Sequence, residues 1–201
     1  LEAVLPPDQE YAGDGTHEIL IKHPVWEDMY RLNPDAVQTE ADNIWTWHVC
    51  DKATGQHNRH DSGTCGCDFA FSGGSFAIAF SFMYKVTGDQ SYLDRAKLIA
   101  DWHWQHRNPE TGLAPDAPGV TGRFDAEHCM TSVVGPHASQ MLKCYELTDD
   151  DHFRDIAISY IKAYDQYGWD DEERSYWGML QLDGTPVLGE KGAAGGYGAG
   201  A

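Results

Sequence analysis

Four acidic residues near the middle of the chain are placed to form a paired carboxylate site. Asp61 and Asp68 precede the stretch 69–84, and Asp125 and Glu127 precede the stretch 129–142; neither stretch contains a charged residue. Glycoside hydrolysis needs two carboxyl groups, one to protonate the leaving oxygen and one to activate water or attack the anomeric carbon. We therefore predict catalysis here, with Asp68 as general acid or base and Glu127 as its partner. The alternative is that these acids cap helices.

Basic side chains next to these acids suggest what the site would bind. Arg59 and His60 come directly before Asp61, and His128 follows Glu127. Arg binds carboxylates well, so these residues could hold the carboxylate of a uronate sugar during hydrolysis. In a lyase the same residues would neutralise that carboxylate, and a histidine or a tyrosine such as Tyr84 would remove the neighbouring proton.

Two further kinds of chemistry remain open. An epimerase needs a base on each side of a sugar ring, for which His48 and His137 are candidates. A non-catalytic repeat could bind saccharide through aromatic stacking alone. Trp45, Trp47 and Trp177 lie near predicted loops and are our candidates for stacking on sugar, although large aromatic side chains are more often buried in packing.

Metal-binding side chains are present, but their spacing is not that of a structural zinc module with paired Cys-x-x-Cys motifs. Buried thiols and hydrogen-bonded loop histidines are the more common explanation for such residues. We therefore predict no metal and no cofactor, except a divalent ion if the lyase interpretation holds. The donors in question are His57, His60, Cys65, Cys67, His128 and Cys129.

A repeated helical hairpin would position the acids. The uncharged stretch predicts a buried helix over 69–86, which ends at a Thr-Gly-Asp turn, and an amphipathic helix begins near Gln90. The same order returns later in the chain at one constant offset, which relates Thr87 to Thr148 and Tyr92 to Phe153. One hairpin cannot bury its apolar face alone, so this repeat offset indicates stacked or ring-closed units. The loops 51–55 and 108–112 are alike, and 169–187 reads as a third such loop with a β-hairpin.

These features resemble the α/α toroid of the six-hairpin glycosidase superfamily. The resemblance rests on the alternating helices, the TGD turn followed by YLDRAKLIADW, and the loop NPETGLAPD, and it covers roughly residues 34–190. It implies an all-α fold of helical hairpin repeats with short β-hairpins or extended loops. A closed ring of six hairpins needs about 350 residues at this period, so the chain supplies an incomplete ring of about three hairpins.

The resemblance also bears on the site. Unsaturated glucuronyl hydrolases, which belong to this superfamily, carry aspartates at the N-terminal ends, or heads, of consecutive inner helices. The first head often contains a His-Asp pair. His60-Asp61 matches that dipeptide, whereas Asp68 better matches the distance to the Thr-Gly-Asp turn. The second head reads DAEHCM and departs from the usual pattern. Related rings occur in N-acylglucosamine 2-epimerases and some pectate lyases.

Composition limits the partners. The chain has 201 residues and a formal charge of −18, which argues against nucleic-acid binding because phosphate neutralisation needs Lys and Arg. We expect a saccharide partner and no membrane insertion, since the uncharged stretch is short for a span of roughly 18 residues. The oligomeric state is left open.

Three segments are expected: an extended lead-in over 1–22, the partial toroid over 23–191, and a glycine-rich tail over 192–201. Five cysteines do not form a dense disulfide framework. No signal peptide is visible, and the location is left open, secreted or periplasmic included.

Overall fold

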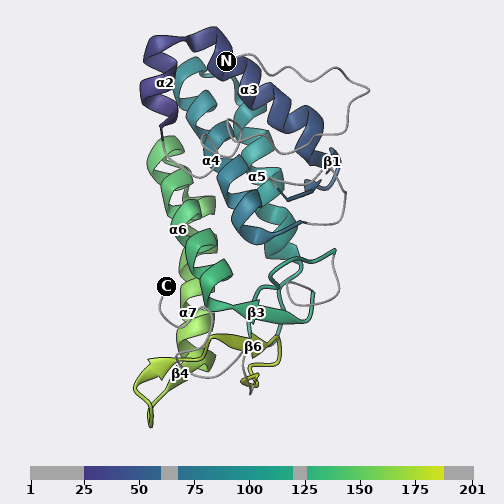
Figure 1. The fold of residues 1–201 in the computed structure, drawn as a ribbon, viewed down its shortest axis with the longest axis vertical. Helices are drawn as coiled ribbons and strands as arrows, with labels where there is room; N and C mark the ends of the chain where they lie inside the picture. The colour runs from purple at the N-terminus through teal and green to yellow at the C-terminus, as the bar shows by residue number, and fades with distance from the viewer. Residues whose placement is uncertain (1–24, 60–67, 120–125, 188–201) are drawn as a thin grey trace.

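The computed structural model describes residues 25–59, 68–119 and 126–187 (Figure 1). Helices follow one another in pairs in these ranges: α2 (Trp26–Leu32) with α3 (Pro34–Asn43), α4 (Ala70–Thr87) with α5 (Gln90–Gln105), and α6 (Thr131–Thr148) with α7 (Asp151–Gly168). A π-helical turn, η1 (Ile44–His48), continues α3. The predicted segments 1–22 and 192–201 lie outside the described residues, so the division into segments stays a prediction.

Short antiparallel strand pairs link the helices. β1 (Val49–Asp51) pairs with β2 (Gln56–His57), and β4 (Trp169–Asp170) pairs with β5 (Ser175–Tyr176). The second of these pairs is the hairpin predicted in the third loop. β3 (His128–Met130) pairs with β6 (Met179–Gln181), which joins the segment before α6 to the segment after α7.

Helix α4 is the centre of the fold, as its lack of charge predicted. It packs against both α5 and α6, and α6 packs in turn against α7 (Figure 1). Phe76, Phe80 and Met83 are completely buried along it. Each buried side chain of this size contributes roughly 1.5–3 kcal/mol of transfer free energy, so this helix anchors the core. In the described part of the chain, no helix is long and apolar enough to cross a membrane.

The sequence repeat is reproduced in the backbone. The repeat offset carries both ends of α4 onto the ends of α6, and it carries the start of α5 onto the start of α7. Gly88 and Asp149 end the two inner helices in the left-handed conformation, with φ of 71° and 56°. Asp89 and Asp150 then cap the outer helices, accepting hydrogen bonds from the backbone N–H groups of Ser91 and His152. Both hairpins therefore use the same turn chemistry.

The predicted likeness of the loops 51–55 and 108–112 is confirmed. Gly55 N–H donates to the Asp51 carbonyl at 2.9 Å, and Gly112 N–H donates to the Asn108 carbonyl at 2.8 Å. Both glycines have positive φ, 81° and 76°. A Cβ on Gly55 would lie 2.3 Å from the Leu98 carbonyl oxygen, so this loop can approach α5 only with glycine.

Candidate functional site

The N-terminal ends, or heads, of the inner helices α4 and α6 are joined by one loop residue, Asp116. Its carbonyl oxygen accepts from Ala70 N–H at 2.8 Å, and its own N–H donates to the His128 carbonyl at 2.9 Å. Its Oδ1 accepts from Met130 N–H at 2.8 Å, and the side chain is completely buried. The loop that carries Asp116 thus holds the two repeat-related heads next to each other. Its place in the NPETGLAPD motif was the signal that could have found this residue.

Asp68 is completely buried. Its carboxylate accepts from Trp102 Nε1 at 2.6 Å and from Gly119 N–H at 2.9 and 3.0 Å. Helix α4 has no side-chain N-cap, so Asp68 does not cap it. A Cβ on Gly119 would lie 3.1 Å from both Asp68 carboxylate oxygens, which is why this loop comes so close. In this conformation Asp68 joins the loop to α5, and its predicted catalytic role stays a prediction.

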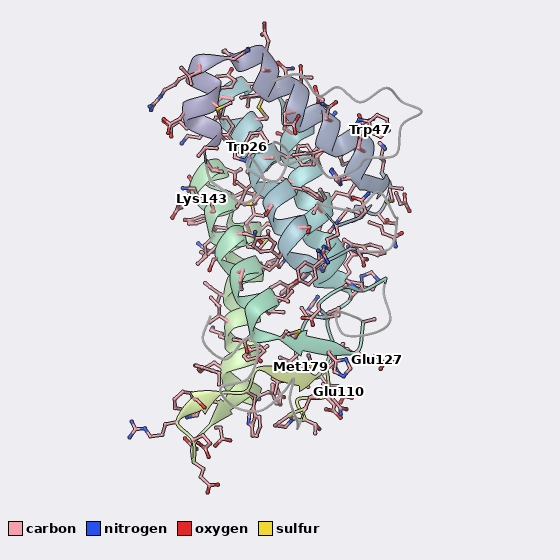
Figure 2. The ribbon with its side chains drawn as sticks, viewed as in Figure 1. Trp26, Trp47, Glu110, Glu127, Lys143 and Met179 are labelled. Atoms are coloured by element: carbon pink, nitrogen blue, oxygen red, sulfur yellow. The ribbon has the colours of Figure 1, made fainter. Side chains whose placement is uncertain are left out.

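Glu127 lies in a different environment. Its side chain is exposed, and its carbonyl oxygen accepts from Leu182 N–H at 3.2 Å. Figure 2 shows it near Met179 at the β3–β6 end of the molecule. Because Asp68 is enclosed, the two carboxylates do not share a solvent-facing cleft in this conformation. The other predicted carboxylates, Asp61 and Asp125, lie outside the described residues.

The predicted substrate-binding residues are spread over several elements. Arg59 is exposed, His128 is half-buried in β3, and His60 lies outside the described residues. Trp45 is half-buried and makes an edge contact with Phe80, with ring centroids 5.9 Å apart.

The other two tryptophans are half-buried. The Trp47 carbonyl accepts from Asn58 Nδ2 at 3.2 Å, and the Trp177 carbonyl accepts from the Tyr164 hydroxyl at 2.6 Å. Their backbones are therefore fixed by buried partners. Stacking of Trp45, Trp47 or Trp177 on sugar stays a prediction.

A row of buried histidines crosses the core below the helix heads. The sequence does not group these residues. His57 Nε2 lies 3.2 Å from His103 Nε2, and the His103 and His137 ring centroids are 5.2 Å apart. Tyr160 continues the row, 5.6 Å from the His137 ring. A Cβ on Gly73 would lie 2.5 Å from His57 Nε2, so the glycine makes room for this pair. Gly73 and the apolar position of His103 were the signals available in the sequence.

The hydrogen bonds fix the tautomers of His57 and His103. His57 Nδ1 lies 2.9 Å from the Asn58 carbonyl oxygen, which only accepts, so Nδ1 carries the proton. In a neutral His57 ring Nε2 then accepts, and His103 Nε2–H must be its donor. Burial lowers the pKa of His57 and His103, and it lowers the pKa of His137 to about 4. All three imidazoles are therefore neutral at pH 7.

The described residues bear on metal binding and on the epimerase interpretation. In the ranges 25–59, 68–119 and 126–187, no group of three or more His, Cys, Asp or Glu side chains could hold a metal ion. His60, Cys65 and Cys67 lie outside these ranges, so the cofactor prediction is untested. His48 and His137, the epimerase candidates, are both buried. Cys50 is disulfide-bonded, whereas Cys129 and Cys144 are free and buried.

No protein-family model matches the chain, and no curated protein matches it. Several solved structures, however, are similar to the chain. An α-mannanase of glycoside hydrolase family 76 from Bacteroides thetaiotaomicron is similar with a TM-score of 0.60 and 16% identity over 84% of this chain. A cellobiose 2-epimerase from Bacillus thermoamylovorans has a TM-score of 0.58 and 16% identity over 89%. A family 105 glycoside hydrolase from C. acetobutylicum has a TM-score of 0.58 and 15% identity over 87% of this chain.

The chain spans about half the length of these structures, 48%, 48% and 51% respectively. Identities this low show the fold alone. The predicted architecture is confirmed at the level of the fold: the described part of the chain has the helical hairpins of a partial α/α toroid.

Proposed function

We propose that this chain belongs to a carbohydrate-active protein that hydrolyses glycosidic bonds in a uronate-containing saccharide. The observation that carries the proposal is the joining of the heads of α4 and α6 by Asp116, which puts the segments bearing Asp68 and Glu127 at one end of the fold. The similar structures include two glycoside hydrolases, and this supports a saccharide as the ligand.

In this proposal the two carboxylates have different tasks. Glu127 is exposed and can donate a proton to a leaving oxygen at the solvent edge. Asp68 accepts from two N–H donors, an arrangement that suits a base or a charge stabiliser better than a proton donor. For Asp68 to act on a substrate, Gly119 must first move away from its carboxylate.

Arg59 is proposed to hold the uronate carboxylate, together with His60 and His128. Arg59 is exposed and follows β2, so it lies at the surface where the loop that leads to α4 begins. The paired N–H groups of guanidinium match a carboxylate, which favours a uronate over a neutral sugar. Asp61 and Asp125 remain further catalytic candidates, and the three predicted tryptophans remain candidates for stacking.

The test is product analysis with oligogalacturonates, with neutral cello-oligosaccharides as the comparison. Hydrolysis releases new reducing ends without ultraviolet absorbance from an unsaturated sugar, whereas a lyase produces that absorbance. We expect Glu127→Gln to lower kcat by roughly 10²–10⁴-fold, the usual contribution of a general acid or base. Glu110→Gln is the matched control, because Glu110 is also an exposed acid at this end of the molecule (Figure 2).

Three outcomes would contradict the proposal. Unsaturated products would favour the lyase and sink hydrolysis. Equal rates for Glu127→Gln and Glu110→Gln would remove Glu127 from the chemistry. Binding of oligogalacturonate without any cleavage, unchanged in Asp68→Asn and Glu127→Gln, would support the non-catalytic saccharide-binding repeat.

A further inference from the structure

Among the large hydrophobic side chains that are exposed in the described ranges, Trp169 on β4 is the aromatic one, and it is 42% exposed. A single exposed hydrophobic side chain is common and needs no special role. This ring, however, is held in a fixed position. Its Nε1 donates to Asp171 Oδ1 at 2.9 Å, and the ring makes an edge contact with Tyr176, with centroids 5.0 Å apart. A ring that is ordered before a ligand arrives loses little entropy on binding.

The partner ring, Tyr176, is fixed as well. It pairs with Trp169 across the β4–β5 hairpin, and its hydroxyl donates to the Asp165 carboxylate in the last turn of α7. The chain after the hairpin is joined to the head of α6, because Thr131 N–H donates to the Gly178 carbonyl at 3.2 Å. The two rings therefore stand on a rigid support between the end of α7 and the head of α6.

A cavity of about 200 Å³ lies beside Tyr176. Tyr164, Asp165 and Tyr176 line it on the side of the hairpin, together with Thr131 at the start of α6, and its other walls are mainly apolar. Mostly apolar walls with a few polar groups are typical of small-molecule sites, which enclose roughly 300–1,000 Å³ for a drug-sized ligand. This cavity is smaller, so its size suits one ring of a saccharide.

The charge around the hairpin limits what can bind. From Asp165 to Tyr176 the chain has five carboxylates and one basic residue, Arg174. A uronate bound here would place its own carboxylate among like charges, which is unfavourable. Carboxylates accept hydrogen bonds, and sugar hydroxyls donate them. Asp165 and Asp171 are therefore suited to the hydroxyl edge of a neutral sugar, whose apolar face would stack on the Trp169 ring.

The hairpin lies at the end of the fold to which the proposed function assigns the saccharide. Figure 1 shows β4 at the same end as β3 and β6, and Figure 2 shows Glu127 at that end too. A saccharide bound at the helix heads would thus meet two surfaces of opposite preference. Arg59 favours a carboxylate, whereas the hairpin repels one.

We propose that Trp169 and Tyr176, with Asp165 and Asp171, form a subsite for one neutral sugar residue of the saccharide. The inference rests on the proposed function in taking a saccharide as the ligand. It adds that the saccharide contains a neutral sugar as well as a uronate, because the hairpin disfavours the carboxylate that Arg59 would bind. A polymer of uronate alone would leave the hairpin unoccupied.

Heteronuclear NMR of the isotope-labelled full chain tests the subsite through the tryptophan indole N–H signals. Trp169→Phe identifies the Trp169 signal by its loss. The chain is titrated with cellohexaose, mannohexaose and xylohexaose, and with hexagalacturonate as the charged comparison. We expect at least one neutral sugar to shift the Trp169 signal, hexagalacturonate to leave it in place, and the signal of Trp26, which is 3% exposed, to stay unchanged in every titration.

Calorimetry then measures how much the ring contributes. We expect Trp169→Ala to raise the dissociation constant of the responding sugar about tenfold or more, the usual effect of truncating a central contact. Trp169→Phe keeps a stacking ring and should lose less. Leu32→Ala is the matched control, because Leu32 is an exposed large hydrophobic side chain on α2, at the opposite end of the described fold (Figure 1).

Three results would overturn the subsite. No shift of the Trp169 signal with any neutral sugar would remove it. An equal shift with hexagalacturonate would show that the hairpin does not select against a carboxylate. A shift with hexalysine and none with the sugars would mean that the hairpin binds a basic peptide. Failure of the proposed function is distinguishable, since cleavage of oligogalacturonate without a Trp169 response overturns only the subsite, and a response to neutral sugar without any cleavage overturns only the hydrolysis.

Discussion

Asp68 and Asp116 are both completely buried, and each accepts hydrogen bonds from the backbone of a segment distant in sequence. Asp68 joins the loop at Gly119 to α5 through Trp102, and Asp116 joins α4 to β3. Carboxylates used in this way hold the heads of the inner helices together. Any catalytic task of Asp68 would be added to this structural one.

Replacing Asp68 measures how much its hydrogen bonds contribute to the free energy of unfolding. Asp68→Ala leaves Trp102 Nε1 and Gly119 N–H without their acceptor, and we expect a loss of about 1–3 kcal/mol in the free energy of unfolding. Asp68→Asn keeps one acceptor oxygen and should lose less. Urea unfolding followed by circular dichroism gives the values, with the exposed Glu172→Ala as control, for which we expect a change within about 0.5 kcal/mol. Equal stability of Asp68→Ala and the parent chain would contradict this role.

The buried histidines make stability depend on pH. Their pKa values are lowered in the folded chain, so below pH 6.5 the unfolded chain binds more protons, and stability falls as the pH falls. For His137 the window runs from pH 6.5 to about 4, and it corresponds to about 3 kcal/mol. Protonating His57 would also place two N–H donors face to face across the 3.2 Å contact with His103.

We therefore expect the free energy of unfolding to be flat between about pH 7 and 8 and to decrease steadily from pH 6.5 to 4.5. Urea titrations at half-unit pH intervals measure it, and His137→Asn should make the slope shallower by removing one titrating group. The capping carboxylates Asp89 and Asp150 also have lowered pKa values, but they lose their contribution only below pH 3.8. A flat profile between pH 7 and 5 would show that the histidines are not held neutral.

At the scale of elements, the two hairpins differ in one turn position. Gly88 ends α4 with φ of 71°, and Asp149 ends α6 with φ of 56°. Glycine adopts this left-handed conformation without a steric penalty, whereas a side chain is strained there. The repeat thus contains a matched pair of sites with the same geometry and different residues.

Exchanging these residues should have opposite effects. We expect Asp149→Gly to stabilise the chain by about 0.5–1 kcal/mol and Gly88→Asp to destabilise it by a similar amount. Thermal unfolding monitored by circular dichroism compares the two variants with the parent chain. Changes of the same sign in both would show that the left-handed turn is not what limits stability here.

Periodicity predicted these elements well because it reports local burial. The uncharged run and the repeat offset predicted the bounds of α4 and α6 closely, and the Thr-Gly-Asp turn predicted where α4 ends and α5 begins. The role of Asp116 and the contact between His57 and His103 could not be predicted. The hydrogen bond from Met130 to Asp116 joins residues 14 positions apart, and the contact between His57 and His103 joins residues 46 positions apart. Both depend on the packing of several elements, which a pattern along one stretch does not record.

At the scale of the whole molecule, the chain has the helical hairpins and loops of a toroid and spans about half the length of similar structures. The strand pairs β3–β6 and β4–β5 lie at one end of the described fold (Figure 1). The turns at Gly88 and Asp149 lie at the C-terminal ends of the inner helices α4 and α6, opposite their heads. The account therefore predicts that saccharide binds at one end of the helices and not at the other.

Hydrogen exchange of the full chain with and without oligogalacturonate tests this claim most directly. The account predicts slower exchange in segments 113–119, 126–130 and 179–182 when the saccharide is present, and unchanged exchange in the turns 86–90 and 147–151. Those turns serve as an internal control in the same sample. Protection of the turns instead, or no protection at the helix heads at saturating oligogalacturonate, would contradict it.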